Sequence, residues 1–215
     1  LVWPTTLDTG SGALTPSDTI NLGVNLRGLV IGSTALKAFT VDAANNQIQV
    51  LDIASKTKGT AINVLPANFK PSALALVAST APDMLAVVSQ SLKQIALLKL
   101  DPVALLNFDP VANACVPTLA PEPIDLVISS GGQWAYVLEQ DGDQSFIQPV
   151  NLHRLQLKPT DAAAAPFKVG DKSRQIVIAP TSDRLYIPFE DTVTDPKGGG
   201  IAFVEVTEQD RGDIF

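Results

Sequence analysis

The sequence contains a single cysteine, Cys115, and a single histidine, His153, among its 215 residues. A disulfide within the chain is therefore excluded, and so is a zinc site that needs several cysteine and histidine ligands. A Ser-His-Asp triad would have to use His153, which follows a predicted strand, and no Gly-x-Ser-x-Gly elbow surrounds any serine. We therefore predict no catalytic residue, and we interpret His153 as a surface residue and Cys115 as a thiol without a chemical role.

Positive charge is also scarce, because 15 lysines and arginines stand against 22 aspartates and glutamates, which gives a net charge of −7. This balance argues against a nucleic-acid partner and against adsorption to an anionic membrane surface. No apolar run approaches the roughly 18 residues that a helix needs to span a bilayer. Charged residues make up only 17% of the chain and hydrophobic residues 46%, which indicates a folded protein with a substantial core.

Short apolar and β-branched runs alternate with turn-forming clusters in the stretch from Ile124 to Leu152. Runs of this length between turn clusters are typical of strands rather than helices. Gly131 and Gly132 separate the first run from the second, because glycine adopts backbone angles that other residues avoid. The pattern predicts three consecutive strands, at residues 126–128, 134–138 and 146–152, with a polar turn at 139–143.

The same strand-turn-strand pattern occurs four times along the chain. The units that align without a gap are LVIGSTALKAFTV (29–41), LVASTAPDMLAVV (76–88), LVISSGGQWAYVL (126–138) and IVIAPTSDRLYIP (176–188). One position of the second strand, at steps of 47, 50 and 50 residues, is held by Phe39, Ala86, Tyr136 and Tyr186. Side chains alternate along a strand, so one face of the first strands is predicted to carry Leu29, Leu76, Leu126 and Ile176.

A unit of this size cannot bury both of its faces alone, whereas blades stacked around a channel cover each other. The predicted fold is therefore all-β. It is a β-propeller with a partial blade at residues 1–26 and blades at 27–70, 71–122, 123–172 and 173–215. An ordinary β-sandwich with coincidental spacing is the alternative.

Two arrangements would account for the partial blade at the start of the chain. The first residues could pair with the last unit and close a four-bladed ring, or the chain could be part of a larger propeller. We favour the second, because residues 1–26 resemble the third and fourth strands of a blade, with an outer strand at 19–24, while the last unit has a third strand of its own. The chain begins with Leu1 and has no signal-peptide pattern, so we expect a processed or shortened product.

The units resemble the bacterial YVTN β-propeller repeat of lactonase-like seven-bladed propellers and surface-layer proteins. The resemblance is carried by IAPTSDRLYIPFED (178–191), ISSGGQWAYVLEQD (128–141) and the linker VGDKSRQIVI (169–178). It departs from the family at Ala86, where the family favours tyrosine, and no unit contains the full tetrapeptide. The resemblance implies a propeller of the seven-bladed type and an extracytoplasmic location, which is periplasmic, cell-surface or secreted.

Carboxylates are the remaining candidates for a metal site. Glu139, Asp141 and Asp143 lie in one polar turn, and Asp191 and Asp195 lie in a long loop of the last unit. Hard oxygen ligands on a flexible loop suit Ca²⁺, although the spacing does not match an EF-hand loop. A solvated hairpin turn is the alternative, and no other cofactor is predicted.

These features favour a non-enzymatic binding or scaffold propeller of the bacterial cell envelope or exterior. Loops at one end of the channel would hold a protein or carbohydrate ligand. The alternative is a lactonase-like hydrolase that uses carboxylates, with or without a divalent metal, at the channel mouth. Convergence of Glu139, Asp141, Asp143 or Asp191 on the channel would favour the enzyme, and side chains that point into bulk solvent would remove its support.

Overall fold

The computed structural model describes residues 2–7, 14–22, 26–32, 36–77, 83–111, 114–115, 119, 121–157, 161–181, 184–190 and 198–206. Nearly all regular structure in these residues is β, with one short helix, α1 (Leu152–Leu157). In this part of the chain no helix has the length and apolar character needed to cross a membrane. The strands are β1 (Val2–Leu7), β2 (Leu14–Thr19), β3 (Leu26–Ile31), β4 (Lys37–Asp42), β5 (Gln47–Asp52), β6 (Thr57–Lys58), β7 (Ala73–Val77), β8 (Met84–Ser89), β9 (Gln94–Leu100), β10 (Val103–Leu105), β11 (Phe108–Asp109), β12 (Ala114–Cys115), β13 (Glu122–Ile128), β14 (Trp134–Asp141), β15 (Gln144–Asn151), β16 (Phe167–Asp171), β17 (Val177–Ile178), β18 (Arg184–Glu190) and β19 (Gly199–Glu205).

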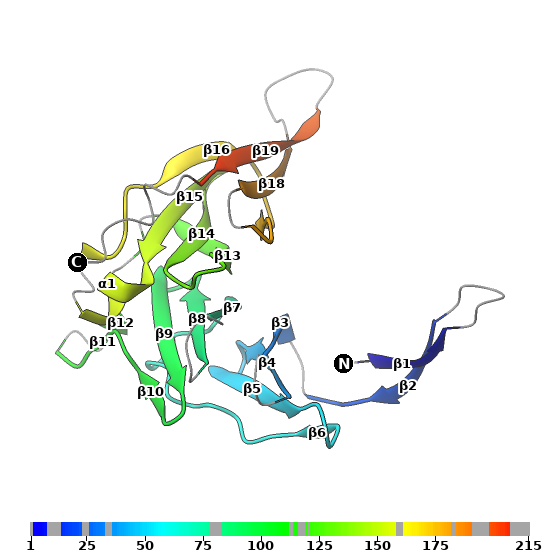
Figure 1. Ribbon diagram of the computed structural model, residues 1–215. Helices are drawn as coiled ribbons and strands as arrows, with labels where there is room; N and C mark the ends of the chain where they lie inside the picture. The colour runs from blue at the N-terminus through cyan, green and yellow to red at the C-terminus, as the bar shows by residue number, and fades with distance from the viewer. Residues whose placement is uncertain are drawn as a thin grey trace.

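Most of these strands form antiparallel sheets that follow one another along the chain, and we divide them into four blades. The first contains β3 to β6, the second β7 to β10, the third β13 to β16 and the fourth β17 to β19. One pair, Asp171 with Glu190, joins β16 to β18, so the third and fourth blades are continuous. The blades follow an open arc with β3, β7 and β13 on its concave side and β6, β10 and β16 on its convex side (Figure 1).

The strand register within the blades confirms the predicted repeat in three of the four units. Phe39, Tyr136 and Tyr186 each pair with the residue nine positions earlier, which is Val30, Val127 and Val177 respectively. In the second blade Ala86 pairs instead with Ala75, eleven positions earlier. The hairpin of the second blade is therefore shifted relative to the ungapped alignment.

Hydrophobic side chains from facing sheets fill the space between consecutive blades. The three inter-blade cores include Phe39, Leu74 and Leu85 (first and second blades), Ala86, Leu126 and Val137 (second and third), and Tyr136, Ile176 and Ile187 (third and fourth). Leu85 and Ala86 are neighbours in β8 but belong to different cores, because side chains alternate across a strand. A middle blade thus packs on both faces, and each fully buried leucine contributes about 1.5–3 kcal/mol.

The helix α1 was not predicted, because a strand was expected to continue to residue 152, where the helix begins. His153 lies in this helix rather than at the end of a strand, and it is exposed. Leu152 and Leu155 are buried in the core between the second and third blades and hold the helix in place. The side chain of Asn151 accepts a hydrogen bond from the Arg154 N–H at 2.9 Å, as an N-cap residue does.

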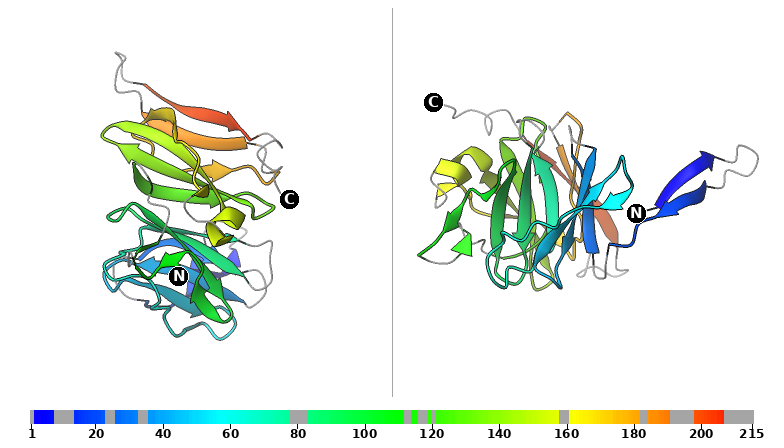
Figure 2. Two further views of the ribbon diagram at one scale, coloured as in Figure 1. Left: turned by 90° about the vertical axis from the view of Figure 1, so that its left-hand side faces the viewer. Right: turned by 90° about the horizontal axis from the view of Figure 1, so that it is seen from below.

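The N-terminal strands β1 and β2 form a hairpin that pairs with no other described strand. Figures 1 and 2 both show this hairpin apart from the arc of blades. The predicted outer strand at 19–24 is wrong for residues 20–22, because β2 ends at Thr19. Leu22 is nevertheless buried against the first blade, where it packs with Ala38 and Leu51.

Candidate ligand-binding clefts at one end of the blades

A polar cleft lies where four connecting segments meet. Its lining consists of Lys93, Pro121, Glu122, Gln140, Asp141, Gly142, Asp143 and Arg174, and its volume is 580 Å³. These residues come from the β8–β9 turn, the segment entering β13, the β14–β15 turn and the segment before β17. We call this end of the blades the connector end, and this cavity the main cleft.

The β14–β15 turn is tight, which brings its two aspartates to the rim of the main cleft. Asp141 pairs with Gln144, so only Gly142 and Asp143 connect the strands. Gly142 has a φ of 59°, in the left-handed region that glycine adopts without a steric cost. Asp141 and Asp143 are both exposed, so their carboxylates are accessible to a ligand.

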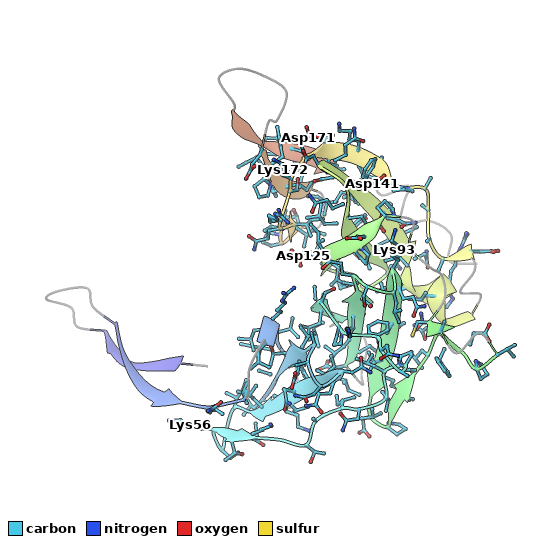
Figure 3. The ribbon with its side chains drawn as sticks, turned by 180° about the vertical axis from the view of Figure 1, so that it is seen from behind. Lys56, Lys93, Asp125, Asp141, Asp171 and Lys172 are labelled. Atoms are coloured by element: carbon cyan, nitrogen blue, oxygen red, sulfur yellow. The ribbon has the colours of Figure 1, made fainter. Side chains whose placement is uncertain are left out.

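Charges of both signs line the main cleft, and their contacts with the protein are weak. The Lys172 Nζ lies 4.0 Å from the Asp143 Oδ1, and an Arg174 guanidinium nitrogen donates to the Gln140 Oε1 at 3.5 Å. Lys93 and Asp141 lie near each other on neighbouring blades (Figure 3). Exposed pairs of this kind contribute only about 0–1 kcal/mol, so a ligand can displace them at little cost.

A second cleft continues from the main cleft along the connector end. It has a volume of 380 Å³ and is lined by Arg27, Ala43, Lys70, Pro71, Ser72, Gln90, Ser91 and Glu122. Glu122 lines both cavities, and it accepts a hydrogen bond from the Gln90 Nε2 at 3.2 Å. The two clefts therefore form one polar groove across the connectors of consecutive blades, with Arg27 and Lys70 at its far end.

Glu139 lies next to this groove but does not line it. It is fully buried in β14, and among the described residues neither of its carboxylate oxygens has a hydrogen-bond partner. Burial raises the pKa of Glu139 to about 8, while the Lys93 ammonium lowers it in part. The side chain is therefore mainly a neutral acid at pH 7, enclosed between the second and third blades.

The structure divides the three predicted metal ligands between two environments. Asp141 and Asp143 reach the main cleft, whereas Glu139 is enclosed behind it. The described residues contain no group of three or more His, Cys, Asp or Glu side chains that could hold a metal ion. Asp191 and Asp195 lie outside the described residues. A Ca²⁺ site at Glu139, Asp141 and Asp143 stays a prediction.

Cys115 is buried in the core between the first and second blades, with its N–H donating to the Gln94 Oε1 at 3.2 Å. Burial raises the pKa of this thiol to about 12, so it remains protonated and unreactive near neutral pH. Lys93, Glu122 and Arg174 line the main cleft but were not predicted to be site residues. The signal that could have found them is the repeat itself, because each lies in a turn or connector at the same end of its unit.

No family model and no curated protein matches the sequence. The resemblance to the YVTN repeat therefore stays a prediction. Among solved structures, the chain is similar to hydrazine synthase of Kuenenia stuttgartiensis with a TM-score of 0.61, at 13% identity over 83% of this chain and 45% of that chain. It is similar to a candidate 6-phosphogluconolactonase from Bacteroides uniformis with a TM-score of 0.58, at 14% identity over 94% of this chain and 59% of that one.

Streptogramin B lyase is a third similar structure, with a TM-score of 0.53 at 11% identity over 93% of this chain and 60% of that chain. Likeness at such low identity concerns the fold alone, and it identifies the blades as those of a β-propeller-type protein. The chain spans between 45% and 60% of the length of these three structures.

Proposed function

We propose that the chain forms part of a non-enzymatic binding propeller that holds a charged segment of another protein in the groove at its connector end. The observation that carries this proposal is the polar groove itself, which joins the main cleft to the second cleft through Glu122. Connections from all four blades contribute to it, and its lining contains cations as well as carboxylates.

The lining of the groove favours a polypeptide over a carbohydrate. Its residues include no aromatic side chain on which the apolar face of a sugar ring could stack. Lys93 and Arg174 supply positive charge within the main cleft, while Asp141 and Asp143 supply negative charge at its rim. A segment that carries both signs of charge would complement this pattern and would be held in one register.

The proposal includes a larger ring and an extracytoplasmic location. Further blades would complete a propeller of the seven-bladed type, as the resemblance to the YVTN repeat implies. The open arc of four blades and the limited share of the similar structures that the chain covers support this reading. A location in the cell envelope or outside the cell is supported by the single cysteine, the acidic composition and that resemblance.

A lactonase-like hydrolase is the second candidate, and Glu139 is the observation that favours it. A carboxyl group with a raised pKa beside a cleft has the protonation state of a general acid. The side chain would have to reach the groove, from which it is enclosed in this structure. Measuring the hydrolysis of simple lactones by the chain and by Glu139→Gln tests this candidate, and equal rates for both would reject it.

The binding proposal is tested with four synthetic peptides of equal length: an acidic, a basic, a mixed-charge and an uncharged one. Fluorescence anisotropy is expected to show tightest binding of the mixed-charge peptide. The double variant Lys93→Glu, Arg174→Glu should weaken that binding by at least about tenfold, because two complementary contacts become repulsive. The control variant Lys58→Glu replaces a positive by a negative side chain in the same way, at an exposed residue of β6. Equal binding of all four peptides, or an equal loss in the control, would reject the proposal.

A further inference from the structure

A further cavity lies between the first and second blades, at the end opposite to the connector end. Gly32 follows β3, Asp83 precedes β8 and Asp101 connects β9 to β10, so both blades contribute to its walls. Its volume is 660 Å³, within the range of about 300–1,000 Å³ that is typical of small-molecule sites. Both walls belong to one junction inside the arc, so they do not depend on any further blade. We call this space the junction cavity.

The inner wall of the junction cavity is apolar. Phe39, Val50 and Ile62 line it. All three also belong to the core between the first and second blades, where they are 4%, 8% and 8% exposed. Leu100 lines the cavity too and packs against the same core. The apolar part of a ligand would therefore be removed from water against this wall, which favours binding.

The charged side chains of the junction cavity are mainly acidic. Its described lining contains three carboxylates, those of Asp52, Asp83 and Asp101, and one ammonium group, that of Lys37. Lys37 pairs with Asp52 across β4 and β5, so these two opposite charges lie on neighbouring strands. The lining as a whole therefore carries net negative charge, which complements a cation and disfavours an anion.

Gly32 brings a buried carboxylate and an aromatic ring to the same corner of the junction cavity. Asp83 is only 8% exposed, yet it lines the cavity. A Cβ added at Gly32 would lie 3.3 Å from the Asp83 Oδ2 and 3.3 Å from the Phe39 Cε2. An ammonium group in this corner would form a charge-assisted hydrogen bond with the carboxylate and a cation–π contact with the ring.

The same position is more filled at another junction of the repeat. Ser129 and Trp134 stand where the first unit has Gly32 and Lys37. They line the equivalent cavity between the third and fourth blades, whose volume is only 210 Å³. At the junction of the second and third blades, the equivalent of Lys37 is Met84, which is buried in the core. The large acidic cavity is therefore a property of the side chains at the first junction and not of the repeat in general.

We infer that the junction cavity binds a small organic cation that carries an ammonium group on an apolar body, as an arylalkylamine does. The ammonium group lies beside Asp83, and the apolar body packs on Phe39 and Val50. The described residues contain no group of three or more side chains that could hold a metal ion, which favours an organic cation over a metal. The volume of the cavity suits a molecule of this size.

This inference goes beyond the proposed binding function, because it concerns the opposite end of the blades and a different class of ligand. The groove at the connector end is lined by polar and charged side chains that suit a polypeptide. The junction cavity combines an acidic rim with an apolar wall, which suits a small amphipathic cation.

The experiment is isothermal titration calorimetry of the chain with three probes: phenethylammonium, its neutral analogue 2-phenylethanol, and methylammonium. Phenethylammonium should bind at least about tenfold more tightly than either of the others, because one lacks the charge and the other lacks the apolar body. Asp83→Asn keeps the shape of the side chain and removes its charge, so it should weaken the binding of phenethylammonium by at least about tenfold.

Gly32→Ser is a second variant that tests the cavity without changing its charge. The third unit already has a serine at this position, and the added side chain would occupy the corner between Asp83 and Phe39, so the affinity for phenethylammonium should fall. The control is Asp109→Asn, which removes a carboxylate in an exposed turn outside the cavity and should leave the affinity unchanged. Circular dichroism establishes that each variant is folded.

Four results would overturn the inference. They are an absence of phenethylammonium binding, equally tight binding of 2-phenylethanol, an unchanged affinity in folded Asp83→Asn or Gly32→Ser, and an equal loss in Asp109→Asn. A lysine-containing peptide that displaces phenethylammonium more effectively than free phenethylammonium does would assign the cavity to a protein side chain and would also contradict it. Binding of the mixed-charge peptide by Asp83→Asn reports on the connector-end groove separately.

Discussion

The carboxylate of Asp125 bridges two blades by accepting a hydrogen bond from the Ile176 N–H at 3.1 Å. Its other oxygen accepts from the Leu126 N–H, within its own strand, at 2.9 Å. Asp125 lies in β13, and Ile176 lies in the segment that leads into β17, so the bond joins the innermost strands of the third and fourth blades. Burial raises the pKa of Asp125, and the two backbone hydrogen bonds lower it in part.

The first prediction concerns this bridge. Replacing Asp125 by alanine leaves the buried Ile176 without the acceptor for its N–H, which should lower the free energy of unfolding by about 1–3 kcal/mol. Because the fourth blade loses its hydrogen bond to Asp125, amide hydrogen exchange in β17 and β18 should accelerate more than in β4 and β5. Asp109→Ala is the matched control, because that carboxylate accepts from the Val111 N–H within an exposed turn. A uniform change in exchange across all blades would contradict the bridging role.

The second prediction concerns the pH dependence that Glu139 introduces. Its pKa is raised from 4.5 to about 8 in the folded protein, so the folded state holds a proton that the unfolded state releases between these values. The contribution of the Glu139 carboxyl group to the free energy of unfolding is fully present below pH 4.5. It is lost as the pH rises toward 8, at up to ~1.4 kcal/mol per pH unit. Glu139→Gln removes this proton, so its stability relative to the unchanged chain should increase steadily across that range.

Urea unfolding at pH 5, 6.5 and 8 measures the difference in the free energy of unfolding between the two proteins. Glu205→Gln provides the control, because Glu205 is an exposed residue of β19 whose carboxylate lies 3.4 Å from an Arg184 nitrogen. A difference for Glu139→Gln that stays constant between pH 5 and 8 would show that the carboxyl group titrates as it does in water.

Position along β14, and not the face of the strand, explains why the predicted metal ligands were separated. Glu139 and Asp141 project from the same face, but Asp141 lies at the exposed end of the strand. The sequence places Glu139, Asp141 and Asp143 in one polar cluster, and we predicted a turn that begins at residue 139. In the structure β14 continues to Asp141, because its partner β15 pairs as far as Gln144. Glu139 is thereby part of an extended strand and shares a face with Val137, which packs in the core between the second and third blades. Composition indicated a turn, but pairing with the next strand determined where the turn begins.

The blade pattern was predictable for a different reason. The pairs Val30–Phe39 and Val177–Tyr186 depend on local spacing, and the sequence repeats that spacing directly. The connector-end groove depends on how the blades are arranged in space, because it joins Lys93 to Arg174 across two blades. The arrangement follows from packing between sheets, which a single sequence does not specify residue by residue.

The third prediction tests how closely the third and fourth blades are packed. A Cβ added at Gly170 in β16 would lie 2.7 Å from the Cβ and 2.8 Å from the Cγ of Phe189 in β18. Gly170→Ala should therefore force these strands apart and lower the free energy of unfolding by about 1–3 kcal/mol, as overpacking does. Near-ultraviolet circular dichroism should weaken as well, because Trp134 packs against the core between these blades.

Gly131→Ala is the matched control for this change, because a Cβ at Gly131, in the turn after β13, meets no atom within 4 Å. Its effect on the free energy of unfolding should stay within about 0.5 kcal/mol. Urea unfolding of both variants decides the question, since the two substitutions add the same methyl group. Equal stability of the two variants would mean that β16 and β18 separate without cost, and that the single pair of Asp171 with Glu190 does not hold the third and fourth blades in close contact.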